Sequence, residues 1–233
     1  MKVSIHQPQY LPWSPYFKKI NEADLFIILD SVGFQKNGLQ NRNQIKTSQG
    51  AHWLTVPVKQ HFGQKISEAR IQNSSNWRKK HWQTIQQNYS KTPFFSTYVE
   101  ELRGIYEHDW TMLDELNVVM LAMFLRWMDI HTQMVSSSKL MTTGVASDLV
   151  LNLCLEVGST HYLSGIGGKN YIDLEAFDKA GIEVVFSDPV LPKVYPQCFP
   201  KTGFIESLSV LDLMLNCGES WRDYFPADGM YEG

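Results

Sequence analysis

The sequence has little cysteine, and its cysteines and histidines form no recognisable disulfide or metal-ligand pattern. The three cysteines, Cys154, Cys198 and Cys217, contain no CxxC pair, and the seven histidines form neither HxxxH nor HExxH. A sparse, odd number of thiols is typical of a reducing compartment, whereas a secreted disulfide framework needs paired cysteines. The sequence therefore predicts a cytoplasmic protein with no metal site.

Long apolar runs are also missing. The longest candidate, residues 116–127, is interrupted by Asn117 and Arg126 and falls short of the ~20 apolar residues that span a bilayer. The N-terminus turns polar and proline-rich before it could form the apolar region of a signal peptide. We therefore expect no membrane insertion.

An excess of positive charge is missing as well. The chain has 21 Lys and Arg against 24 Asp and Glu, a net charge of −3, which lacks the basic footprint that duplex nucleic acid attracts. By contrast, aromatic residues reach 12% and apolar residues 43%. This composition predicts a single domain over residues 1–233, with a large core and no nucleic-acid partner.

The first thirty residues have the pattern of a strand, a helix and a second strand. Residues 2–5 form a short apolar run that ends at His6, and Tyr16, Phe17 and Ile20 follow at helical spacing. Residues 25–29 are continuously apolar and end at Asp30, as a buried parallel strand does. This βαβ unit predicts an α/β fold with an open, mostly parallel sheet and flanking helices.

The remaining chain continues this alternation after an insertion. Residues 31–72 contain an NRNQIK run, an SQG turn and a WLTVPV run, which predict an inserted β-hairpin. Further strands are predicted at residues 132–135, 160–163 and 183–186, and further helices at residues 78–89, 109–130, 147–157 and 204–216.

His6 and Asp30 follow the first two predicted strands, at the edge where ligands bind in open α/β sheets. An imidazole accepts a proton near neutral pH and can return it later, and Pro8 fixes the backbone just after His6. His6 is thus a candidate base with Asp30 as its orienting partner. The alternative is that His6 only satisfies backbone groups at a strand end.

Two other segments could bind an oxyanion. Asn41, Arg42 and Lys46 combine amides with cations, and a guanidinium matches phosphate with two parallel hydrogen bonds. Residues 164–171, SGIGGKNY, place three glycines and Lys169 after a predicted strand, although neither GxxxxGK[ST] nor GxGxxG matches. The alternatives are a charged hairpin edge and a tight turn.

Aromatic residues and one thiol complete the candidates. Trp77 and His81 share a helix face and could stack on a base or sugar, while an amphipathic helix is the alternative. Cys198 is the thiol in a polar loop, but it lacks an adjacent base in sequence and is a weak candidate nucleophile.

These motifs in their order and spacing resemble the WbqC-like family. The resemblance covers residues 3–218 and is carried by HQPQYLPW, QNRNQIK, SNWRKKHW, HYLSGIGGKNY, YPQ and FIESLSVLDLMLNCG. It implies a cytoplasmic protein of bacterial surface-polysaccharide pathways, such as O-antigen and lipopolysaccharide synthesis, that acts on a nucleotide-linked amino sugar. The positions that carry over are His6, Gln7, Pro8, Tyr10, Asp30, Asn41, Arg42, Lys46, Trp77, His81, Ser164, Gly165, Gly168, Lys169, Tyr171 and Gln197. The sequence departs from the resemblance at Gly38 and Leu39, where an aromatic is expected.

Together, the residues and the resemblance predict an N-acyl or aminoacyl transferase. His6 would act as the base, and Arg42, Lys46 and Lys169 would hold the diphosphate beside the backbone N–H groups of residues 165–168. The sugar hydroxyls and rings would be read by Gln7, Tyr10, Asn41, Trp77 and Tyr171. No bound cofactor is predicted.

The acyl donor stays open between coenzyme A, an acyl carrier protein and an activated amino acid. Two alternative functions also remain. One is a nucleotidyltransferase-like or adenylate-forming enzyme, although residues 7–20 lack the second histidine of that motif. The other is a non-catalytic sugar-nucleotide-binding protein.

Overall fold

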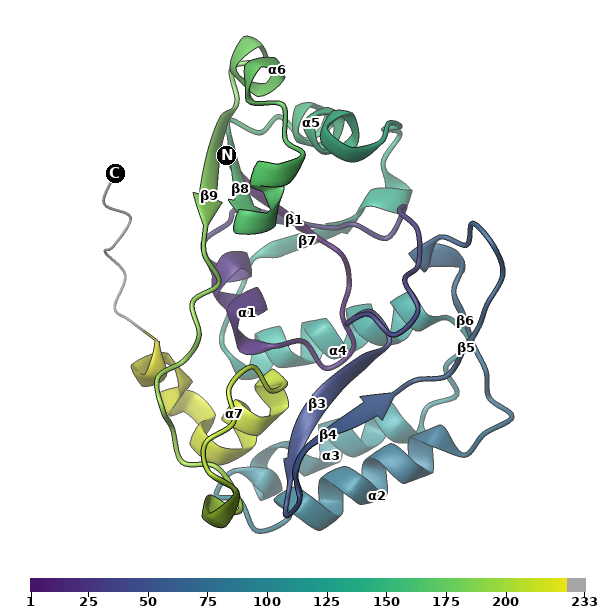
Figure 1. The fold of residues 1–233 in the computed structure, drawn as a ribbon, viewed down its shortest axis with the longest axis vertical. Helices are drawn as coiled ribbons and strands as arrows, with labels where there is room; N and C mark the ends of the chain where they lie inside the picture. The colour runs from purple at the N-terminus through teal and green to yellow at the C-terminus, as the bar shows by residue number, and fades with distance from the viewer. Residues whose placement is uncertain (226–233) are drawn as a thin grey trace.

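The computed structural model describes residues 1–225, which are built around a five-stranded, entirely parallel sheet (Figure 1). The strand order is β7-β2-β1-β8-β9. The strands are β1 (Lys2–His6), β2 (Leu25–Ile28), β7 (Gln133–Ser136), β8 (His161–Gly165) and β9 (Glu183–Ser187). The chain therefore starts in the middle, builds outward through β2 and β7, and then returns to the other side of β1. The predicted α/β fold with flanking helices is confirmed.

Helices cover both faces of the sheet because its side chains alternate. Phe26 and Ile28 of β2 join the core on one face, against α1 (Ser14–Asn21) and α4 (Leu113–Trp127). Ile27 points to the other face, with the core of α5 (Ala146–Glu156) and α6 (Leu174–Lys179). Figure 1 shows these two helical layers above and below the sheet.

The segment inserted after β2 forms two antiparallel hairpins. The predicted hairpin is β3 (Arg42–Thr47) paired with β4 (Gly50–Thr55), and the positive φ of 98° at Gly50 closes its turn. A second, shorter hairpin joins β5 (Val58–Lys59) to β6 (Arg70–Ile71).

A second half of the molecule packs α2 (Trp77–Tyr89), α3 (Phe95–Glu107) and α7 (Val210–Cys217) with β3 and β4 (Figure 1). Helix α3 was not predicted, although Phe95, Tyr98, Leu102 and Ile105 recur at helical spacing. Helix α4 begins at Leu113 rather than near Asp109, and α7 begins at Val210 rather than at residue 204.

Short 3₁₀ helices connect these elements. They are η1 (Ile66–Glu68), η2 (Ser137–Lys139), η3 (Ile166–Asn170), η4 (Pro200–Thr202) and η5 (Gly218–Tyr224). Within residues 1–225, no helix combines the length and apolar character needed to cross a membrane.

Candidate functional site

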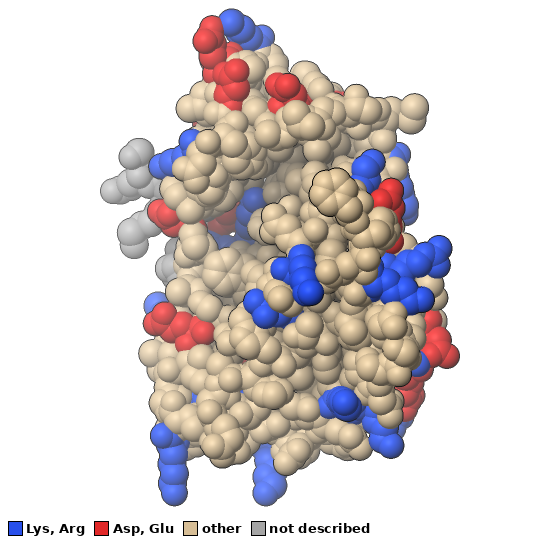
Figure 2. All heavy atoms as spheres, turned by 45° about the vertical axis from the view of Figure 1, so that its right-hand side comes forward, with Lys and Arg blue, Asp and Glu red and all other residues tan. Residues whose placement is uncertain are grey.

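A crevice opens where the strand order reverses, between the carboxyl ends of β1 and β8. In open α/β sheets this switch point is where ligands bind, because the connections on its two sides leave in opposite directions. The crevice is lined by His6 at the end of β1, by Lys19 of α1 and by Gly165 at the end of β8. Figure 2 shows a hollow between the two halves of the molecule, with side chains of both charge signs in it.

His6 is held as a neutral base at this position. Its Nδ1 lies 3.0 Å from the carbonyl oxygen of Gln7, which can only accept, so Nδ1 carries the proton and Nε2 keeps a lone pair. Tyr16 packs edge-on against the ring at 5.0 Å and donates its hydroxyl to the same carbonyl. Burial, helped by the charge of Lys19, lowers the pKa of His6 to about 4. The imidazole is therefore uncharged at neutral pH.

Lys19 brings a cation to the same crevice, and the sequence analysis missed it. Its Nζ donates to the carbonyl oxygen of Ile5 at 3.0 Å, which ties α1 to β1 directly before His6. Burial lowers the pKa of Lys19 to about 8, so its charge is lost only in mildly alkaline solution. Its place on the helix that follows the first strand is the signal that could have found it.

The glycine-rich exit of β8 forms the opposite wall. A Cβ atom at Gly168 would lie 2.1 Å from Oγ of Ser164 and 3.2 Å from the Phe186 ring, so any side chain there must displace the Ser164 hydroxyl. Ser164 is buried and donates to the carbonyl oxygen of Gly165 at 3.1 Å. Gly168 and Ser164 thus shape the loop, and Gly165, Ile166 and Gly167 line the crevice, whereas Lys169 lies outside its lining. Lys169 lies 5.6 Å from the Phe186 ring as a cation–π contact.

The rest of the crevice mixes charges with one flat aromatic wall. Its further lining residues include Trp13, Lys18, Glu22 and Asp188, none of which the sequence analysis selected. Lys18 and Glu22 lie 3.6 Å apart on α1. The crevice therefore offers groups for an anion and groups for an ammonium.

Asp30 is buried, but the structure does not place it on His6. Its Oδ1 accepts from the Ser137 hydroxyl at 2.9 Å and from the Ser138 backbone N–H at 2.8 Å. Its Oδ2 accepts from the Ser138 hydroxyl at 2.5 Å. Asp30 thus fastens the end of β2 to η2, and the carbonyl of Gln7 occupies the orienting position predicted for it.

Lys46 and Gln197 lie together inside the second half of the molecule. Lys46 is 1% exposed, and its Nζ donates to Oε1 of Gln197 at 3.0 Å and to the carbonyl oxygen of Gly203 at 2.5 Å. Its ammonium joins β3 to the segment after β9, away from the lining of the crevice.

Tyr10, Trp77 and His81 form a buried aromatic cluster in the same half. The Tyr10 hydroxyl lies 2.8 Å from both Nδ1 of His81 and the Tyr106 hydroxyl. The rings of Trp77 and His81 meet edge-on at 5.3 Å. Burial lowers the pKa of His81 to about 4. These side chains build the core.

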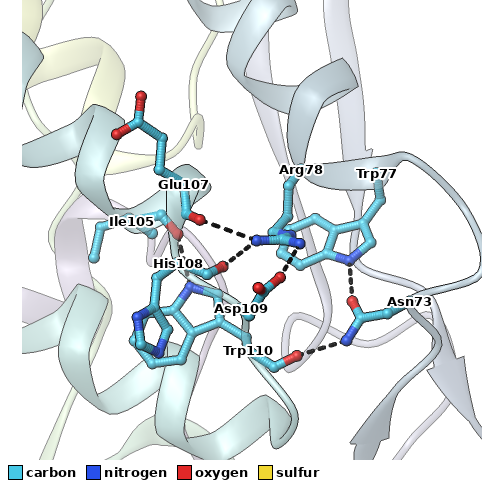
Figure 3. Close-up of polar contacts among 8 residues, drawn as sticks. All are labelled: Asn73, Trp77, Arg78, Ile105, Glu107, His108, Asp109 and Trp110. Carbon is cyan, nitrogen blue, oxygen red and sulfur yellow. Dashed lines mark hydrogen bonds and ion pairs between the residues drawn. The ribbon is translucent and has the colours of Figure 1, made fainter.

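Figure 3 shows how the start of α2 is held. The Trp77 indole N–H donates to Oδ1 of Asn73 at 3.0 Å, and Arg78 donates to the carbonyl oxygens of Glu107 and His108 at the end of α3. Arg78 also pairs with the Asp109 carboxylate. The hydrogen-bond donors of the Arg78 guanidinium are thus used by backbone carbonyls and a carboxylate, although a guanidinium could otherwise bind phosphate.

The other predicted binding residues are dispersed. Asn41 donates to the carbonyl oxygen of Val56, and the Arg42 guanidinium lies 4.3 Å over the Trp53 ring. The side-chain oxygen of Gln7 accepts from Gln40, and Tyr171 is about half exposed at the end of η3. These four side chains lie outside the lining of the crevice.

The comparison with known families agrees with the resemblance seen in the sequence. The WbqC-like protein family model matches residues 7–224, nearly the whole chain. The chain belongs to the WbqC-like protein family. This WbqC-like chain is 37% identical over 226 residues to a protein from Mycobacterium tuberculosis (strain ATCC 25618 / H37Rv) named "Uncharacterized protein Rv1507c", covering 96% of each. No solved structure matches it.

The family match includes the crevice of this WbqC-like chain. Lys19, Gly165 and Asp188 lie within the matched residues, and His6 is the residue directly before the match begins. Chemically, the crevice combines a lone pair on a neutral imidazole, an ammonium that titrates near pH 8 and the backbone of a glycine-rich strand exit. Such a set can bind an anion and accept a proton beside it.

Proposed function

We propose that this WbqC-like protein is an N-acyltransferase that acts on an amino sugar carried by a nucleoside diphosphate, in surface-polysaccharide synthesis in the cytoplasm. The observation that carries the proposal is the pairing of neutral His6 with cationic Lys19 at the switch point of the parallel sheet. A base and a cation in one crevice suit a substrate with a reacting amine and a phosphate.

The charges of the crevice suit such a zwitterionic substrate. Lys18 and Lys19 would contact the diphosphate, with the backbone N–H groups of the strand exit at Gly165 beside them. Asp188 would orient the amino group of the sugar by accepting a hydrogen bond from it. Trp13 gives a flat surface on which the base or the sugar ring can stack.

In the proposed reaction, the free amine of the sugar attacks the carbonyl carbon of an acyl donor. A carbon–nitrogen bond forms, and the bond to the leaving group then breaks. The attacking nitrogen becomes positively charged and much more acidic, so even a weak base such as His6 can take its proton at Nε2. His6 then passes that proton to the leaving group. The donor is a thioester of coenzyme A or of a carrier protein, or an activated amino acid.

A nucleotidyltransferase or adenylate-forming enzyme is the second candidate. The observation that favours it is the histidine at the end of the first strand of a sheet whose order reverses beside it, where a nucleotide binds in many α/β folds. Release of pyrophosphate from a nucleoside triphosphate distinguishes it from acyl transfer.

Mass spectrometry of the reaction products tests the proposal. The purified protein is incubated with a panel of nucleotide-linked amino sugars and acyl donors, and a mass increase equal to one acyl group is expected. His6→Gln should lower kcat by ~10²–10⁴ while sugar-nucleotide binding, measured by calorimetry, changes little. His131→Gln, at an exposed histidine, is the matched control. Binding without turnover across the panel would favour the non-catalytic alternative.

A further inference from the structure

A large apolar side chain projects into solvent among cations on the second hairpin. Phe62 lies in the loop between β5 and β6 and is fully exposed. Lys59, Lys65 and Arg70 on the same segment are exposed, as is Lys36 on the loop beside it. We call these five residues the basic loop patch. Figure 2 shows several Lys and Arg side chains, with Asp and Glu side chains between some of them, on the side of the molecule that β5 and β6 form in Figure 1.

Cations outnumber carboxylates in the basic loop patch, since residues 59–70 contain Lys59, Lys65 and Arg70 against Glu68. Lys59 and Arg70 stand directly opposite each other across the two strands, an arrangement of like charges that weakens a hairpin. Within residues 1–225, no carboxylate lies within 4 Å of the cationic groups of Lys36, Lys59, Lys65 or Arg70. The carboxylate of Glu68 accepts from the Lys65 backbone N–H. An acidic partner would relieve this repulsion.

Backbone hydrogen bonds hold the basic loop patch at the edge of the sheet that carries the crevice. Phe34 N–H donates to the Gln64 carbonyl at 2.8 Å, and Ile66 N–H donates to the Val32 carbonyl at 2.9 Å. Ser67 N–H donates to the carbonyl oxygen of Asp30, two residues after the end of β2. The basic loop patch is thus anchored at the end of β2, the neighbour of β1, while its own residues lie outside the lining of the crevice.

We propose that the basic loop patch docks an acidic carrier protein that delivers the acyl group as a thioester. This inference rests on the proposed acyl transfer, and it selects the donor. The sugar amine attacks the thioester carbon, the carbon–sulfur bond breaks, and the carrier leaves as a thiol with the proton taken through His6. Phe62 supplies the apolar anchor, and the four cations steer the encounter.

An acidic protein fits this surface better than nucleic acid does. The chain as a whole carries a net charge of −3, which repels a long polyanion, whereas a compact partner meets only the local cations. A single exposed phenylalanine also matches a small apolar pocket between helices of a partner protein.

Binding of an acidic acyl carrier protein, loaded with an acetyl thioester, tests the proposal. Surface plasmon resonance compares the parent with the double variant Lys59→Glu/Arg70→Glu and with Phe62→Ser. The charge reversal should slow association about 10- to 100-fold at low salt, and the difference should shrink at high salt. The double variant Lys79→Glu/Lys80→Glu, at exposed lysines of α2, makes the same change of charge away from the patch and should bind like the parent.

Turnover with two donors separates this proposal from the proposed function. The patch variants should lose kcat/KM with the acetyl carrier protein but keep it with acetyl-pantetheine. If the protein acylates the sugar from acetyl-pantetheine but the parent and the patch variants bind the carrier protein equally well, the docking proposal is overturned and the proposed function stands. Patch-dependent carrier binding without acylation from either donor supports docking and contradicts the proposed reaction. Patch-dependent binding of an oligonucleotide or anionic vesicles, without carrier binding, overturns docking.

Discussion

The buried histidine of α2 should make the stability of this protein depend on pH. His81 is 6% exposed, and burial lowers its pKa from 6.5 to about 4 in the folded chain. Between these pH values the unfolded chain binds a proton at this position and the folded chain does not. The contribution of His81 to the free energy of unfolding is therefore complete above pH 6.5 and is lost as the pH falls toward 4.

The size of this effect follows from the difference in pKa. A difference of about 2.5 pH units at 1.36 kcal/mol per unit gives about 3 kcal/mol between pH 6.5 and 4. Between these pH values the free energy of unfolding thus changes by about 1.4 kcal/mol per pH unit, the value for the uptake of one proton. Asp114, whose pKa burial raises to about 6, acts in the opposite direction, and His6 acts in the same direction as His81. Comparing the parent with a variant at position 81 therefore isolates the contribution of His81.

Urea unfolding of the parent and of His81→Gln at pH 4.5, 5.5, 6.5 and 7.5 measures the effect. His6 and Asp114 are present in both proteins, so their contributions cancel in the difference. The stability advantage of the parent over the variant should shrink as the pH falls, by about 3 kcal/mol over the full window. Trp82→Phe, a change without a titratable group on the same helix, should run parallel to the parent. A constant difference between the parent and His81→Gln would refute the reasoning.

Two further predictions concern the crevice. The pH profile of kcat/KM should have limbs near 4 and 8, the pKa values of His6 and Lys19 in the free enzyme, and Lys19→Arg should move the upper limb out of range because arginine stays charged. An upper limb that stays near 8 in Lys19→Arg would assign it to another group. Gly168→Ala should destabilise by about 1–3 kcal/mol through overlap with Oγ of Ser164, and adding Ser164→Ala should restore part of the loss in thermal unfolding. Equal melting temperatures of Gly168→Ala and the parent would contradict this.

The opening of the fold was predictable because local patterns decide it. The apolar runs before His6 and Asp30 are short, as buried strands are, and the helical spacing between them predicted the first crossover. The hairpin of β3 and β4 was signalled by its turn at Gly50. Helix α3 was equally predictable, because its buried residues Phe95, Tyr98, Leu102 and Ile105 recur at helical spacing in the sequence.

The candidate site could be predicted only at the strand ends. His6 and Gly165 were found because strand ends in an α/β sheet meet at one edge. Lys46 was selected as a cation near amides that could bind an oxyanion, and His81 because it shares a helix face with Trp77. Long-range packing buries both side chains against partners distant in sequence. Asp188 directly follows β9, so the rule that found His6 and Gly165 could have found it as well.

A buried polar network connects the second half of the molecule to the crevice. Asp212 of α7 accepts hydrogen bonds from Tyr89 at 2.7 Å and Tyr195 at 2.8 Å, and burial raises the pKa of its carboxyl. Lys46 lies close enough to attract it electrostatically and holds Gln197 through its Nζ. Tyr195 and Gln197 belong to the segment that begins with Asp188, so the network fixes the chain that forms one wall of the crevice.

A double-mutant cycle on this network gives the last prediction. Lys46→Met removes a buried cation and leaves the Asp212 carboxylate without its nearby charge, so it should destabilise by about 3 kcal/mol in urea unfolding. Asp212→Asn in the Lys46→Met background removes the uncompensated charge. The double variant should therefore lose ~1–2 kcal/mol less than the single losses added together. Additivity to within about 0.5 kcal/mol would mean that the two charges do not interact, and that hydrogen-bond donors such as the tyrosine hydroxyls stabilise the Asp212 carboxylate without help from Lys46.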